Sequence, residues 1–485
     1  MWRELGSHED VGFVQDGSGA SVDPVRMTTR VTADFEALSD RLRGRLVRPG
    51  EPDWDVARRA WNLAVDQRPA AVVEALGPDD VQAVVAFAAG AGLRVAPQST
   101  GHGSEALGPL AEAILLKTTP MRGITVDPAA GIARIEAGVI AGEVAVAAGE
   151  HRLAPVLGLA PTVGVAGLTL GGGTGWLSRS YGLAANNVRA LEVVTAAGAH
   201  KRIDAHDEPE LFWALRGGGG RFAIVTALEL DAHPVPEVSA GSLFWPAEHA
   251  AEILERFRRW TVDVPESLGA VFRYLSMPPI DEVPAPLRGR KVVAIIAAHL
   301  GTEPDGRRIM EPLRGSRTTL IDTFGPVGAA DLVRIAGDPE RPGPARGAGF
   351  LVKELRPDLV HALAELIAED ALAPLGVLEV RLLGGALSRG SEGAGALASL
   401  DGKFSIFAGG PAFDADTRAA IDDRLEGLHD RLEPWRSSQA LLNSARFGTD
   451  PARAFGEETW ARLGRVRDTY DPDRLILSSH EIPPS

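Results

Sequence analysis

One histidine of this 485-residue chain stands inside a glycine turn, Gln98-Ser99-Thr100-Gly101-His102-Gly103-Ser104. Further along, six glycines fall between Gly164 and Gly175, whereas 55 glycines among 485 residues predict about 1.4 in a stretch of twelve. Backbone N–H groups of such segments can approach a flat or anionic ligand where a Cβ atom would collide. The two segments therefore predict two walls of a ligand cleft, with His102 placed to touch the ligand.

The sequence around these segments predicts the elements that position them. A helix over residues 81–91 precedes a strand over residues 93–97, which leads into the His102 turn. Residues 188–195 followed by Ala197-Gly198 predict a hairpin arm. Because short β-like runs alternate with helices from Val31 to Val235, this part favours an α/β domain.

The pattern changes after Val235. Helices over residues 250–261 and 359–372 separate strands over residues 292–298 and 377–383, and residues 339–349 are expected to be a linker rich in proline, glycine and arginine. This shift predicts a second, α+β domain. A last helix is predicted over residues 457–470.

Composition limits the partners of the chain. A formal net charge of −15 with no basic block argues against binding nucleic acid or an anionic membrane. With no cysteine, the chain has no disulfide, no cysteine nucleophile and no thioether link to a cofactor. Residues 1–30 are expected to be a flexible segment without a secretion signal, so we expect a cytoplasmic monomer or homodimer whose partner is a small molecule.

Other cofactor motifs fit this sequence poorly. No Gly-Lys-Ser or Gly-Lys-Thr follows the glycine cluster, which disfavours a phosphate-binding loop. A nicotinamide-binding Rossmann domain is disfavoured because its glycines should follow the first strand. Two interpretations of the cluster remain, a cofactor wall and a loop that packs closely against a neighbour. No histidine and carboxylate cluster has metal-ligand spacing.

Several motifs together resemble the vanillyl-alcohol-oxidase type of FAD-binding fold, and within it the berberine-bridge-enzyme-like oxidases. They are the His102 turn, residues 161–173, residues 177–183, residues 207–220 and the ending Tyr470-Asp471-Pro472-Asp473-Arg474-Leu475. The resemblance implies an α+β chain, with a PCMH-type two-subdomain FAD-binding domain (31–235) and an inserted α+β substrate domain built on an antiparallel sheet (236–435). It also implies a segment (436–485) that returns to the FAD domain.

The resemblance further implies where FAD lies. Its pyrophosphate is expected over Ser99 to Ser104, its isoalloxazine over Thr162 to Gly175, and its 8α-methyl bonded to His102. Ala160 stands where many members carry a second, cysteinyl link, so a single attachment is expected. The expected cofactor-binding residues are Gln98, Ser99, Thr100, Gly101, His102, Gly103, Ser104, Leu107, Thr162, Val163, Gly164, Gly167, Gly171, Gly172, Gly173, Thr174, Trp176, Val225 and Asn443.

Family members take a proton from a substrate hydroxyl while hydride passes to the flavin, which oxygen then reoxidises. Thr174 and Leu441 stand where relatives carry tyrosines that act as bases. The candidates to replace them are Tyr274, Glu379, His480 and Glu481. Arg381 is expected either to orient a polar substrate or to pair with Glu379.

The predicted function is that of an FAD-dependent oxidase acting on an alcohol, a sugar or a natural product, with molecular oxygen as the second substrate. The alternative is a flavin-containing scaffold of secondary metabolism that binds a metabolite or catalyses a non-oxidative cyclisation or rearrangement. The loss of both tyrosine positions motivates this alternative.

Overall fold

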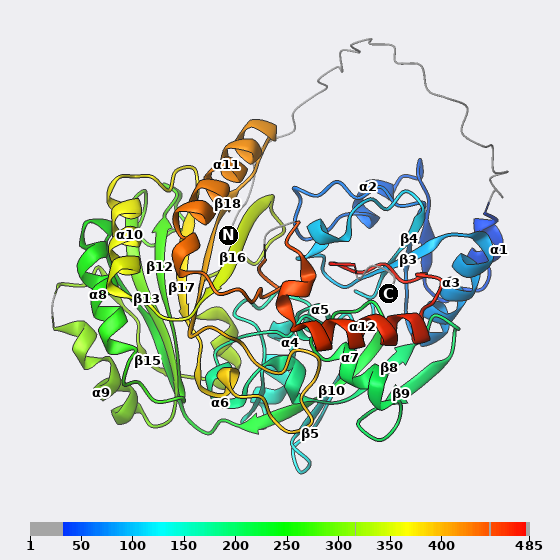
Figure 1. Cartoon of the computed structure of the whole chain (residues 1–485), viewed down its shortest axis with the longest axis horizontal. Helices are drawn as coiled ribbons and strands as arrows, with labels where there is room; N and C mark the ends of the chain where they lie inside the picture. The colour runs from blue at the N-terminus through cyan, green and yellow to red at the C-terminus, as the bar shows by residue number, and fades with distance from the viewer. Residues whose placement is uncertain (1–32, 316, 446–447, 482–485) are drawn as a thin grey trace, which may run out of the picture.

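The computed structural model describes residues 33–315, 317–445 and 448–481, whose strands form three sheets. The flexible segment predicted over residues 1–30 lies outside the described residues. Figure 1 shows the largest sheet at one end of the molecule and the two smaller sheets at the other. The predicted α+β class with a large antiparallel sheet is confirmed.

The four-stranded sheet carries the His102 turn at one end of a strand. Its order is β1 (Arg45–Val47), β2 (Ala71–Glu74), β4 (Ala113–Lys117) and β3 (Arg94–Gln98), with β2 and β3 parallel to β4. Helix α3 (Pro78–Ala91) packs its apolar face on this sheet. It begins at Pro78, three residues earlier than predicted, because proline fits the first turn of a helix. The short helices α1 (Phe35–Ser39) and α2 (Trp54–Ala57) precede this sheet along the chain.

The second sheet packs against the helices that flank or contain the second glycine segment. Its strands are β5 (Ile124–Asp127), β6 (Ile132–Glu136), β10 (Ile224–Pro234), β8 (Val188–Val194) and β9 (His200–Ile203), with β7 (Leu153–Pro155) paired to β10. The predicted hairpin is the antiparallel pair β8–β9. One apolar core joins this sheet to α4 (Ala141–Gly149), α5 (Val165–Leu170), α7 (Pro209–Leu215) and α12 (Glu457–Tyr470). The short helix α6 (Ser178–Tyr181) follows α5.

The third sheet is antiparallel and lies wholly between residues 238 and 411. Its strands are β14 (Ile321–Asp322), β11 (Val238–Pro246), β13 (Lys291–Leu300), β12 (Leu268–Ser276), β17 (Val377–Leu382), β18 (Phe404–Pro411) and β16 (Ala345–Val352), with β15 (Gly325–Val327) paired to β11. One face is covered by α8 (Ala250–Trp260), α9 (Glu303–Arg314), α10 (Pro357–Ala368) and α11 (Ala415–Arg431) (Figure 1). The other face packs on residues 154–184, which include the second glycine segment.

The predicted linker over residues 339–349 is wrong in its second half, because β16 begins at Ala345. The glycines that suggested a linker serve a close approach within the sheet. A Cβ atom on Gly347 would lie 2.5 Å from the Phe407 ring of the neighbouring strand. The strand therefore needs glycine at this position to accommodate the aromatic ring.

The C-terminal segment returns to the first sheet, beside the strand that leads to His102. Ile476 forms a parallel bridge with Val95, and the Leu477 N–H donates to the Val95 carbonyl at 2.7 Å. Arg179 of α6 joins the two halves of the chain, donating to the carbonyls of Leu268 and Leu383 in the third sheet region. The face of the third sheet is thereby fixed against the glycine segments.

Candidate active site

A buried polar network around Gln98 supports the His102 turn. The Gln98 side chain donates to Gln67 Oε1 at 3.1 Å and accepts from Lys117 Nζ at 2.5 Å. Burial lowers the pKa of the Lys117 ammonium to about 8, so the group is still largely protonated at neutral pH. Gly101 has a φ of 84°, and a Cβ atom there would lie 2.9 Å from the Ala60 Cβ atom. The turn therefore requires glycine at this position.

His102 is held between an aromatic ring and a hydroxyl. Its imidazole stacks on Trp61, with ring centroids 4.6 Å apart and planes 15° apart. Its Nδ1 lies 2.8 Å from Thr100 Oγ1. Burial lowers the pKa of the His102 imidazole to about 4, so the ring is neutral at physiological pH. A neutral imidazole in a fixed orientation is suited to nucleophilic attack through a ring nitrogen.

The second glycine segment lies directly against the first. The Gly164 N–H donates to Thr100 Oγ1 at 3.3 Å, and a Cβ atom on Gly164 would lie 2.6 Å from Ser99 Oγ. Asn443 joins the same place, because its Oδ1 accepts from the Gly173 N–H at 3.1 Å. The structure thus brings together the two predicted walls and the predicted C-terminal asparagine.

The two glycine segments carry donors without partners and stretches of open backbone. Within the described part of the chain, four buried hydroxyls on the walls lack a hydrogen-bond partner, those of Ser99, Ser104, Thr162 and Thr169. A Cβ atom on Gly103 or Gly167 would meet nothing within 4 Å. Buried hydroxyls are normally satisfied, so the four groups indicate a polar ligand at this place.

Other expected cofactor residues take part in packing. Val163 accepts from the Ala141 N–H at 3.0 Å at the start of α4. Trp176 packs between the halves of the molecule, and Leu107 and Val225 join other apolar cores. A Cβ atom on Gly171 would lie 2.6 Å from Asn443 Nδ2, and one on Gly172 would lie 2.8 Å from Leu397 Cδ2, so a larger residue at either position would displace that side chain.

The face of the third sheet that packs on residues 154–184 carries a buried ionic network. Arg273 on β12 and Glu379 on β17 are register partners, and Arg273 Nε donates to Glu379 Oε2 at 2.7 Å. Arg381 Nη2 donates to Glu379 Oε1 at 2.6 Å. Arg273 also binds Asp338 at 2.9 Å, so two cations and two carboxylates balance. Arg381 Nη1 donates to Thr174 Oγ1 at 3.3 Å, which connects this network to the second glycine segment.

The predicted Glu379–Arg381 pair therefore exists, and it changes the expectation for Glu379. Burial alone would raise the pKa of Glu379, but Arg381 and Arg273 together lower it to about 2. A carboxylate held by two guanidinium groups has little affinity for a proton. Glu379 is therefore no base at neutral pH, and we do not propose it as one.

The three tyrosines all lie away from the Arg381–Thr174 contact. Tyr274 lies on the opposite face of β12, 2% exposed in the core beneath the helices. It is one residue from Arg273, and successive strand side chains point to opposite faces. Tyr181 stacks on His233, and Tyr470 donates to Glu208 at 2.6 Å. Because the chain has three tyrosines, none reaches the Arg381–Thr174 contact.

The last two base candidates belong to the C-terminal segment. Glu481 is exposed and binds Arg94 at 3.2 Å, so its placement does not bring it to Arg381. His480 is half-buried beside the Leu442 backbone, next to Asn443, and burial together with Arg221 lowers the pKa of its imidazole. The role of His480 as the base stays a prediction. The sequence did not predict three residues of the site, Trp61, Arg273 and Asp338. Of these, only Arg273 left a signal, because it alternates with Tyr274 along the strand.

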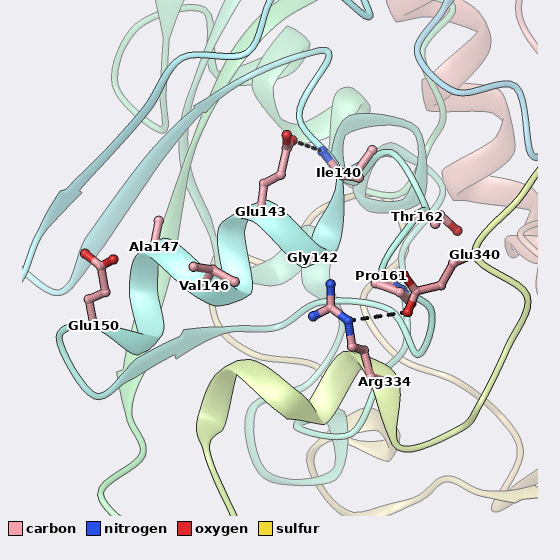
Figure 2. Close-up of a pocket in the computed structure, with 10 residues that line it drawn as sticks. All are labelled: Ile140, Gly142, Glu143, Val146, Ala147, Glu150, Pro161, Thr162, Arg334 and Glu340. Carbon is pink, nitrogen blue, oxygen red and sulfur yellow. Dashed lines mark hydrogen bonds and ion pairs between the residues drawn. The ribbon is translucent and has the colours of Figure 1, made fainter. Parts of the chain in front are cut away.

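A cavity of about 450 Å³ lies on the outer side of the second glycine segment, between α4 and η4 (Ala329–Arg334). Figure 2 shows Thr162 at one end of it and the ion pair of Arg334 with Glu340 along one side, 3.4 Å apart. Neither His102 nor Arg381 lines it. This cavity is therefore separate from the contact between the third sheet and the glycine segments.

Comparisons with known proteins support the same cofactor. The chain matches the FAD binding domain family over residues 69–204. It is 31% identical over 284 residues to (R)-6-hydroxynicotine oxidase of Paenarthrobacter nicotinovorans, covering 58% of this chain and 60% of that protein. It is 25% identical over 475 residues to the FAD-linked oxidoreductase YvdP of Bacillus subtilis (strain 168), covering 92% of this chain and 99% of that protein.

The fold agrees over nearly the whole chain. The crystal structure of 6-hydroxy-D-nicotine oxidase from Arthrobacter nicotinovorans superposes with a TM-score of 0.81 at 25% identity, covering 92% of this chain and 98% of that one. The chain therefore contains an FAD binding domain and shares its overall fold with an FAD-linked oxidase. The similarity of this FAD-linked oxidoreductase to oxidases implies a small-molecule substrate and oxygen. Among the described residues of the enzyme, no helix is long and apolar enough to cross a membrane.

The residues of this FAD-linked oxidoreductase fit FAD. The four unpartnered hydroxyls can donate to phosphate and ribityl oxygens, and the open glycines leave room for a flat ring system. Hydrogen bonds connect His102 through Thr100, and Arg381 through Thr174, to the second glycine segment.

Proposed function

We propose that this enzyme is an FAD-dependent oxidase that removes hydride from a carbon of an alcohol, a sugar or a natural product. The observation that carries the proposal is the contact of Arg381 with Thr174, because it sets a charged sheet face against the expected flavin segment. When bound, FAD would accept the hydride and pass the electrons to oxygen. The similarity to a protein named (R)-6-hydroxynicotine oxidase supports the assignment.

We also propose that His102 attaches the flavin covalently. Its neutral ring can act as a nucleophile, and Trp61 and Thr100 restrict its orientation. Ala160 and the absence of cysteine leave this as a single attachment. The attached cofactor would then be held in place independently of its own binding equilibrium.

Arg381 and Thr174 are proposed to hold a polar group of the substrate. The Arg381 side chain is 23% exposed, so it can contact a ligand while Glu379 fixes its position. A guanidinium placed beside a hydroxyl stabilises the oxyanion that forms as the hydroxyl loses its proton. With Glu379 engaged and tyrosine elsewhere, His480 is the remaining candidate base.

We further propose the divisions 31–235, 236–435 and 436–485 as the FAD domain, the substrate domain and the returning segment. The strands of the third sheet all fall within the second division, which supports it. The oligomeric state, monomer or homodimer, and the cytoplasmic location stay predictions.

An absorbance spectrum of the purified enzyme, followed by acid precipitation, tests the proposal. We expect flavin bands, and flavin that stays with the precipitate. The His102→Ala variant should release its flavin, while His151→Ala, an exposed histidine of the same domain, should not. Anaerobic mixing with a panel of alcohols, sugars and amines should bleach the flavin with at least one compound class. Protein without flavin would refute the proposal, and flavin that no compound reduces would favour the non-oxidative alternative.

A further inference from the structure

A fully buried arginine ends the four-glycine run, and part of its guanidinium has no partner. Arg221 is 1% exposed, and its Nη2 donates to the Ser479 carbonyl at 3.3 Å. Its Nε and Nη1 find no hydrogen-bond partner among the described residues. A Cβ atom on Gly219 would lie 2.9 Å from Arg221 Nη2, so the guanidinium lies directly against backbone.

The position of Arg221 is between the two glycine segments. Ser479 lies two residues beyond Leu477, which runs parallel to β3 and donates to Val95; β3 itself continues into Ser99 and the His102 turn. On the other side, the Gly219 N–H donates at 2.9 Å to the carbonyl of Leu170, the last residue of α5. Arg221 is thus linked to strand β3 through the C-terminal segment and to helix α5 through Gly219.

The charges around Arg221 do not balance. Arg467 binds Asp471 at 3.1 Å, and Glu481 binds Arg94 at 3.2 Å and lies 3.9 Å from Arg467. These two carboxylates pair with Arg467 and Arg94, so the guanidinium of Arg221 is left without a carboxylate of its own. Burial lowers the pKa of Arg221 to about 9, with Glu481 opposing and Arg467 adding to the effect, so Arg221 stays protonated at neutral pH. A buried cation normally has an anionic partner.

Arg216, the buried arginine that precedes the four glycines, differs from Arg221 in having partners. Arg216, at the start of the glycines, donates to the Gly393 carbonyl at 2.7 Å and to the Phe212 carbonyl at 3.4 Å. Its guanidinium also lies 4.2 Å above the Phe212 ring. Arg216 therefore has partners within the protein, whereas two nitrogens of Arg221 remain available for a ligand.

We propose that Arg221 is the counter-charge of the FAD diphosphate, which it binds through Nε and Nη1. The inference rests on FAD binding by this enzyme. The diphosphate is the anionic part of FAD, and a guanidinium binds such oxygens through two parallel N–H groups. The unpartnered hydroxyls of Ser99 and Ser104 would add donors from the first glycine segment.

The test compares a flavin that has a diphosphate with one that lacks it. All variants carry His102→Ala so that flavin can exchange, and fluorescence titration gives the Kd for FAD and for riboflavin. Arg221→Gln and Arg221→Met should weaken FAD at least about tenfold, the equivalent of one lost charge-assisted hydrogen bond, and leave riboflavin unchanged. Arg94→Gln is the control, because it loosens Glu481 in the tail and keeps Arg221.

Each result decides the proposal. An unchanged ratio of the FAD and riboflavin affinities in both Arg221 variants would overturn it. An equal loss for both flavins would also overturn it, and would make Arg221 an anchor of the tail. Should neither variant fold, Arg221→Lys replaces them, and a ratio at least threefold below the parent supports the proposal while an unchanged ratio overturns it. A parent chain that binds no FAD would instead refute the cofactor assignment.

Discussion

Replacing Glu379 by glutamine should strongly destabilise the third sheet, because it removes the charge that two buried arginines share. Glu379 is 3% exposed and accepts from Arg273 at 2.7 Å and from Arg381 at 2.6 Å. In the variant, Arg273, whose side chain is 7% exposed, keeps Asp338 as its remaining carboxylate partner. The variant therefore buries an excess positive charge.

Removing one partner of a buried ion pair typically lowers the free energy of unfolding by about 3–5 kcal/mol. For a cooperative unit of roughly 200 residues this corresponds to a fall in Tm of about 6–20 °C. The effect should depend on pH in one direction. The folded-state pKa of Glu379, about 2, lies below its ordinary value of 4.5. Its contribution is therefore present above about pH 4.5 and is lost as the pH falls toward 2.

Thermal unfolding of the enzyme and of Glu379→Gln at pH 7 and pH 3 measures both effects. Glu392→Gln is the matched control, since that glutamate is exposed, and its Tm should change little. Arg273→Met combined with Glu379→Gln should lose less stability than the two single changes added together. A loss below about 1 kcal/mol at pH 7, or a difference from the enzyme that does not shrink at pH 3, would refute the reasoning.

Two further changes test the site. Tyr274→Phe should leave kcat unchanged, because Tyr274 lies in the core on the far face of β12; a fall of about 10²–10⁴-fold in steady-state assays would instead identify a base. Gly167→Ala should lower the flavin content without lowering the Tm, because its Cβ atom would enter open space where the flavin is expected. Gly175→Ala should lower both, since its Cβ atom would lie 1.6 Å from the Leu157 carbonyl oxygen. Absorbance ratios and melting curves separate these outcomes, and equal behaviour of the two glycine variants would contradict the distinction.

The sequence predicted the parts of the site that depend on local backbone. The His102 turn and the second glycine segment were found because glycine density follows from the approach of two chain segments, as the contact of Gly164 with Ser99 shows. Asn443 was placed through the family resemblance, and its bond to Gly173 agrees with that placement. Such features leave a signal in the residues themselves.

The parts that depend on the pairing of distant strands could not be predicted. Glu379 was a base candidate with Arg381 as its one expected partner, because its second partner, Arg273, is 106 residues away and meets it only through the register of β12 and β17. Trp61 reaches His102 through the fold of residues 54–64, which carry no motif. The edge strand β16 resembled a linker because it is rich in glycine. The reason for glycine there is the close approach of the Phe407 ring, which depends on the pairing of two distant strands.

The charges around the site are fixed over the physiological pH range. The pKa of Glu379 is about 2 and that of His102 is about 4, so the first stays ionised and the second stays neutral above pH 5. The carboxylates of Glu379 and Asp338 raise the pKa of Arg273, so its guanidinium stays protonated throughout this range. The network can therefore hold a polar substrate group and stabilise negative charge on it, but it cannot itself accept the proton of an oxidised hydroxyl. That proton has to leave through His480 or solvent, or the substrate has to be one whose oxidation releases no hydroxyl proton, such as a neutral amine.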